Sequence, residues 1–198
     1  HACGFDSIPS DLGALLLATE LQKQGHQIAS IQTTVRRLRG GLSGGTLASM
    51  LGLVQDAVRD KNLRRILGHP YSLNPEGQRS GADGSDRTDA RFDPDHDRWT
   101  APFIMASINN RVVRRSAAVL GYGSEHFRYD EAMACPTKGR AKTIARGLKA
   151  FTVLTALAPT RWIIKRVLPK PGEGPNQEQR ERGCFELHLV GRAVGNPA

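Results

Sequence analysis

The chain has 198 residues, enough for one sizeable domain or two small ones. Its 28 Lys and Arg residues against 19 Asp and Glu residues give a formal net charge of +9, which favours anionic partners such as nucleotide phosphates or acidic lipid headgroups. Only six Phe and three Tyr accompany this charge, and no motif interleaves aromatic with basic residues. Nucleic acid is therefore not expected as a partner.

Cysteine usage indicates a reducing compartment, and hydropathy indicates that no segment of the chain spans a membrane. Cys3, Cys135 and Cys184 are far apart and form no C-x-x-C pair, so neither a zinc site nor a disulfide framework is expected. The longest apolar run, Ala150 to Pro159, is about half of the roughly 20 residues that a membrane span requires. We expect a cytoplasmic protein, either free or held peripherally at the inner face of the plasma membrane.

The first part of the chain alternates helix and strand patterns. A helix is predicted over 10–24, with Ser10 as its N-cap and Gly25 as its stop. A β-branched strand over 27–39, a glycine-rich turn over 40–45 and a helix over 46–60 follow.

The pattern then dissolves from Lys61 to Trp99, a segment so long that we expect a functional flap or partial disorder. Within it, Asp93, Asp95 and Asp97 have the spacing of a calcium loop. Arg98 stands where such a loop needs glycine, so we expect a solvated acidic turn and no metal site.

The remaining elements complete an α+β pattern. The sequence predicts, in order, a helix over 103–120 ended by Gly121, a strand over 127–133, a helix over 138–168 broken near Pro159, a polar loop over 170–182 and an alternating strand over 184–193. This mixture predicts an α+β fold in which a mixed sheet carries helices on one face.

Three local patterns have both a structural and a functional interpretation. The turn around Ser7 either provides capping chemistry or lines a ligand cleft at a strand end. The loop Gly40 to Thr46 is either a tight turn or an anion site at a helix N-terminus, although it matches neither the Walker nor the Rossmann glycine spacing. Arg111, Arg114 and Arg115 either meet a phosphate or form a solvated helix face.

A basic segment near the C-terminus also has two interpretations. Nine basic residues and no acidic residue lie between Ala132 and Gly172, next to apolar residues that include Phe151, Leu154 and Trp162. Such a segment lies on a membrane surface or against an acyl chain, or it is a basic outer face over a buried stripe.

Six motifs carry a resemblance to a known family that covers nearly the whole chain. In this order they resemble motifs of the saccharopine dehydrogenase-like oxidoreductases, most closely the bacterial branch of trans-acting enoyl reductases. The first and the fifth are the most specific. The motifs are Cys3–Gly13, Ser43–Ser49, Ala101–Phe103, Asn109–Ser116, Phe127–Glu131 and Pro171–Pro175.

The resemblance implies part of a Rossmann-type two-domain oxidoreductase. Residues 1–25 would be the end of the nucleotide-binding domain with its cleft motif, and residues 26–198 the catalytic and substrate domain, an α/β-type second domain with a long loop near 61–101. NADP or NAD would be bound mainly by an N-terminal Rossmann domain that these 198 residues lack. The resemblance names no catalytic residue. It implies cofactor-side residues Gly4, Phe5, Asp6, Ser7 and Pro9, and substrate-side residues Ser43, Gly44, Gly45 and Thr46.

The implied activity is hydride transfer from NAD(P)H to an enoyl double bond. The substrate would be a polyketide or fatty-acyl intermediate, presented in trans on a carrier protein. The alternative is a non-catalytic lipid- or membrane-associated protein with the same fold, which contacts the membrane through residues 138–170.

Overall fold

The computed structural model describes residues 7–40, 44–167 and 172–195. The elements in chain order are α1 (Ile8–Lys23), β1 (Ile28–Arg39), α2 (Gly44–Arg59), α3 (Lys61–Gly68), β2 (Arg91–Asp93), β3 (Arg98–Pro102), α4 (Ala106–Leu120), β4 (Gly123–Cys135), α5 (Lys138–Ala156), α6 (Ala158–Val167), α7 (Gln177–Glu181) and β5 (Cys184–Ala193). The predicted α+β class is confirmed.

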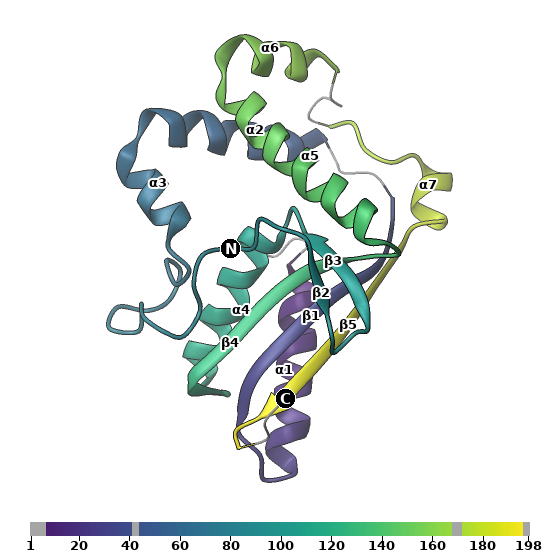
Figure 1. Cartoon of the computed structure of the whole chain (residues 1–198). Helices are drawn as coiled ribbons and strands as arrows, with labels where there is room; N and C mark the ends of the chain where they lie inside the picture. Colours follow the sequence, from purple (N-terminus) through teal and green to yellow (C-terminus); the bar gives the residue numbers. More distant parts are fainter. Residues whose placement is uncertain (1–6, 41–43, 168–171, 196–198) are drawn as a thin grey trace.

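The strands form one sheet of order β2-β3-β4-β1-β5 (Figure 1). β1 pairs in parallel with β4, with Ile31 opposite Tyr129 and Thr33 opposite Glu131. The other three pairings, β1 with β5, β3 with β4 and β2 with β3, are antiparallel. The sheet is therefore mixed, as the sequence predicts.

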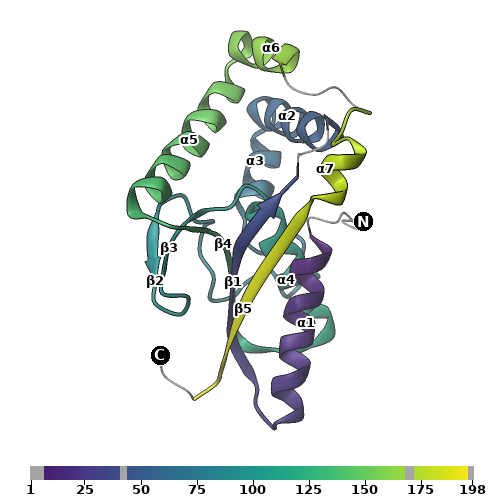
Figure 2. The same ribbon diagram turned by 90° about the vertical axis from the view of Figure 1, so that its right-hand side faces the viewer.

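Helices α1 and α4 cover one face of this sheet, and Figure 2 shows both on the same side of β1 and β5. The core beneath them is apolar, and two glycines let α1 approach β5 closely. A Cβ added to Gly191 would lie 2.8 Å from Leu17 Cδ2, and one added to Gly13 would lie 3.1 Å from Leu189 Cδ2. The buried core residues are Ala14, Ala18, Ile28, Ile31, Val113, Ala117, Tyr122, Phe127 and Tyr129.

Helices α2, α3, α5 and α6 form a second group beyond the carboxyl ends of the parallel strands (Figure 1). α5 packs on β3 and on α2, and α6 folds back on α5. The break between α5 and α6 falls at Leu157, next to Pro159, as predicted. Within the described ranges, no helix combines the length and apolar character that crossing a bilayer requires.

Several local predictions are wrong. α1 begins at Ile8 with Pro9 in its first turn, so Ser10 lies inside the helix and does not cap it. The segment 61–99 is not continuously irregular, because it contains α3, β2 and the start of β3. The acidic turn is solvated at Asp95 and Asp97 but not at Asp93, whose buried carboxylate lies 3.0 Å from Nδ1 of the buried His96.

Candidate functional site

The parallel pair β1 and β4 defines the edge of the sheet where a ligand site is expected. α1 and α4 run back along these strands (Figure 2), and their first turns lie beside Glu131 in the carboxyl-terminal half of β4, opposite Thr33 in the middle of β1. In open α/β sheets this edge is where ligands bind.

Four buried polar side chains meet at this edge, and we call them the Glu131 cluster: Ser7, Ser10, Asn109 and Glu131. Ser7 Oγ donates to Asn109 Oδ1 over 2.9 Å, and Ser10 Oγ donates to Glu131 Oε1 over 3.1 Å. Asn109 Nδ2 donates to the same Glu131 oxygen over 3.3 Å. The cluster joins the start of α1, the first turn of α4 and the middle of β4, and thereby connects three of the motifs.

Further polar groups are buried next to this cluster because of the strand register. Thr33 and Tyr129 lie on the same sheet face as Glu131, under α1 and α4. The Tyr129 side chain interacts with Thr33, Ser10 and Glu131, so these buried polar groups form one network with the cluster.

Burial raises the pKa of Glu131 to about 7, although the hydrogen bonds from Asn109 and Ser10 act in the opposite direction. Burial and the nearby Glu131 carboxylate also raise the pKa of Tyr129 well above its ordinary value. Glu131 therefore holds a proton through most of the acidic range and titrates near neutral pH, as general acids and bases do.

The cofactor-side residues predicted from the sequence fall partly on this cluster. Ser7 is a buried member of it, and Pro9 lies half-buried in the first turn of α1. Gly4, Phe5 and Asp6 lie outside the described residues. The contact between Asn109, Ser10 and Glu131 was not predicted, because no local sequence pattern links residues so far apart.

The substrate-side residues lie at the start of α2. Gly44 opens this helix, and its N–H donates to the carbonyl of Glu173 over 2.8 Å. Gly45 and Thr46 follow in the first turn, whereas Ser43 lies outside the described residues. The helix that these residues begin lines an apolar cavity farther along its length.

The predicted arginine row is neither a phosphate site nor a solvated face, because two of its members are buried. Arg111 donates to Asp86 over 2.8 Å and to the carbonyl of Leu67 over 2.6 Å. Arg114 donates to Asp83 over 2.6 Å and to the carbonyl of Tyr129 over 2.8 Å. These bonds fasten the long segment between α3 and β2 onto α4.

That fastened segment forms one wall of a cavity of about 560 Å³, which we call the polar cleft. The opposite wall includes polar residues of β1 and β4, among them Gln32 and Asp130. Within the described chain, Gln32 Nε2, Arg87 Nε and Asn110 Oδ1 are buried lining atoms without a hydrogen-bond partner. These residues line the cleft, but the three atoms themselves are shielded by neighbouring protein atoms.

A smaller cavity of about 220 Å³ lies between α2, α5 and residues 103–107, and we call it the apolar cavity. Asp86 and Arg87 line both this cavity and the polar cleft, so the two spaces meet at these residues. The other lining residues are Met50, Leu51, Val54, Phe103, Ile104, Ala106, Ser107, Leu148, Phe151, Thr152 and Thr155.

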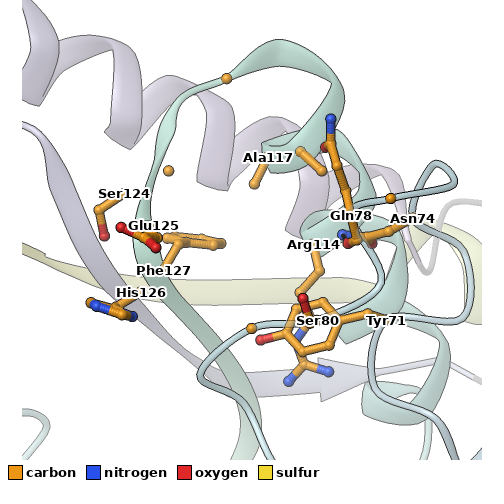
Figure 3. A pocket seen from close by; sticks show the side chains of 15 residues that line it. Tyr71, Asn74, Gln78, Ser80, Arg114, Ala117, Ser124, Glu125, His126 and Phe127 are labelled. Carbon is orange, nitrogen blue, oxygen red and sulfur yellow. Dashed lines mark hydrogen bonds between the residues drawn. The ribbon is translucent and has the colours of Figure 1, made fainter.

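A third cavity, of about 590 Å³, lies at the opposite end of β4 (Figure 3). Figure 3 shows Arg114 beside the ring of Tyr71, with Glu125 and His126 on the strand across from them. The guanidinium lies 5.5 Å from the ring centroid and already bonds to Asp83. This cavity lies at the amino end of β4, away from the edge where ligands are expected.

Comparison with known proteins supports the resemblance. A Mycobacterium tuberculosis protein provisionally named a trans-acting enoyl reductase is 38% identical over 205 residues, which cover 94% of the chain. Proteins named trans-acting enoyl reductase from Mycobacterium ulcerans and Mycobacterium bovis are 33% identical over 93% of it. These proteins are homologues of the chain. The chain spans about half the length of these curated relatives, 48% in each case.

No family model matches the chain, and no solved structure matches it. The wider saccharopine dehydrogenase-like assignment therefore stays a prediction from the motifs.

Proposed function

We propose that the protein containing this chain is an NAD(P)H-dependent reductase that acts in trans on the enoyl double bond of a polyketide or fatty-acyl intermediate. The observation that carries this proposal is the similarity to trans-acting enoyl reductases along 94% of the chain. The Glu131 cluster supports it, because it joins the two most specific motifs, through Ser7 and Glu131, at the ligand-binding edge of the sheet.

The start of α1 fits a nicotinamide ring. Ser7, the N-cap residue of α1, directs its hydroxyl to Asn109 and does not cap the helix with its own side chain. Ile8, 39% exposed, and the half-buried Pro9 add an apolar surface for a flat ring. We assign Ser7 and Pro9, with Gly4, Phe5 and Asp6 before them, to this contact. A bound nicotinamide would supply the hydride.

In this proposal, Glu131 and Asn109 are positioning residues. Asn109 accepts from Ser7 and donates to Glu131, so it fixes the beginning of α1 against β4. Below about pH 7 the Glu131 carboxyl keeps its proton, and the cluster stays neutral. Ionisation at higher pH places an uncompensated buried charge beside the proposed cofactor contact, which disfavours the same geometry. Gly44, Gly45 and Thr46, with Ser43, are assigned to the substrate side.

The test is NADPH or NADH oxidation by the full-length protein with an enoyl thioester of N-acetylcysteamine. We expect oxidation that depends on the double bond, with the saturated thioester as control substrate. Asn109→Ala should reduce turnover on the order of 100-fold because the cofactor contact is displaced. Asn62→Ala, the same change on the exposed surface of α3, should have no effect. Absence of oxidation with either cofactor would refute the proposed activity.

A further inference from the structure

We propose that the apolar cavity and the polar cleft form one acyl-binding site, in which the cavity holds the acyl chain and the cleft holds the neutral thioester end. This inference rests on the proposed function, because it names where that substrate binds. The site would lie on α2, α5 and the segment 82–91, beyond the cofactor-side and substrate-side residues that the resemblance implies.

The walls of the cavity present carbon atoms. Met50, Leu51 and Val54 face it from α2, and Leu148 and Phe151 face it from α5. The two threonines that also line it do not make it polar, because their hydroxyls bond within their own helix. Thr152 Oγ1 donates to the carbonyl of Leu148 over 2.9 Å, and Thr155 Oγ1 donates to that of Phe151 over 2.8 Å.

The size of the cavity suits a narrow ligand part. Its volume of about 220 Å³ is below the roughly 300–1,000 Å³ that drug-sized ligands occupy. It is too small for a folded peptide segment, whereas a slender alkyl chain fills such a space and buries its methylenes at about 0.8 kcal/mol each.

The junction with the polar cleft determines what the other end of the ligand must be. Arg87 bonds to Asp130 over 2.5 Å and to Thr100 over 2.7 Å, so its charge is compensated. Because Asp130 already compensates the guanidinium, the junction favours a neutral group such as a thioester over a free carboxylate.

The rest of the cleft is polar without being charged in one sense. Polar and uncharged residues such as Gln32, Ser85 and Thr88 line it, as a polar, uncharged linker would require. Acidic and basic side chains both line the cleft, so no single sign of charge dominates it. An amphipathic ligand that crosses the junction at Asp86 and Arg87 would use both spaces at once.

The test is titration of the chain with octanoyl-N-acetylcysteamine, a saturated thioester, followed by calorimetry without cofactor. Val54→Phe fills the cavity and should weaken binding at least tenfold, and Val54→Leu should give an intermediate loss. Val58→Phe, the same change one turn along α2 on an exposed residue that does not line the cavity, should bind like the wild type. Thermal melting checks that each variant is folded.

Equal affinity of Val54→Phe and wild type would overturn the cavity assignment. Octanoate binding as tightly as the thioester would overturn the assignment of the cleft to a neutral group. Because the probe has no double bond and the titration contains no nicotinamide, binding can succeed where the reductase assay fails, and the two proposals fail separately.

Discussion

Replacement of Glu131 by Gln tests whether this buried carboxyl is neutral in the folded protein. Its folded-state pKa of about 7 lies above its ordinary value of 4.5, so between these pH values the native state binds more protons than the unfolded state. The free energy of unfolding is then highest below pH 4.5 and falls as the pH rises to about 7. At about 1.4 kcal/mol per pH unit, the loss amounts to about 3 kcal/mol.

The assay is urea unfolding between pH 4.5 and 8.5, followed by tryptophan fluorescence. Gln cannot ionise, so the Glu131→Gln variant should lose this part of the pH dependence. This holds even if the substitution changes the free energy of unfolding by the same amount at every pH. Glu125→Gln, the same substitution at an exposed position on the same strand, should retain the wild-type slope. Identical pH profiles for wild type and Glu131→Gln would refute the inference that Glu131 is protonated when the protein folds.

Two further predictions concern the anchored segment and the basic helices. Arg114→Met leaves the Asp83 carboxylate without its 2.6 Å partner and should lower the free energy of unfolding by about 3–5 kcal/mol in urea. Arg115→Met, at an exposed neighbour, should cost much less. On α5 and α6, Leu154 and Trp162 are 43% and 57% exposed beside the basic residues. We therefore expect the protein to co-sediment with anionic vesicles, and we expect both added salt and Trp162→Ala to reduce this binding. Equal binding to neutral and anionic vesicles, or no binding to either, would contradict the prediction.

The sequence predicted well those features that depend on neighbouring residues. The alternation of β5, the stop at Gly121 and the break near Pro159 follow from strand periodicity, a left-handed glycine and the proline ring. Each of these signals is complete within a few residues. The α+β class followed from their order along the chain.

The candidate site could not be predicted to the same extent, because its contacts join distant parts of the chain. Ser10 is a residue type common at N-caps, but the helix begins at Ile8, and the Ser10 hydroxyl bonds to Glu131, 121 positions later. One signal was available: in the alternation Phe127, Tyr129, Glu131 of β4, a carboxylate occupies a position that should face the core. A buried acid at such a position marks a candidate site.

The long segment between α3 and β2 gains its order from α4. Its polar composition predicts a flap, yet the buried Arg111 and Arg114 bind its backbone carbonyls and its carboxylates. These bonds to Asp83 and Asp86 hold the residues immediately before Arg87, which lies where the two cavities meet. A polar segment without a core of its own can hold such a residue in place only through bonds to a rigid helix.

The same helix therefore serves both parts of the proposed site. Through Asn109, α4 positions the start of α1 and the proposed cofactor contact, and two and five residues later Arg111 and Arg114 position the wall of the polar cleft. Residues on one helix keep a fixed mutual geometry. The proposed cofactor contact and the proposed thioester site are therefore both attached to one rigid element. Rigid placement of two reacting groups is the contribution that a protein makes when its cofactor supplies the chemistry.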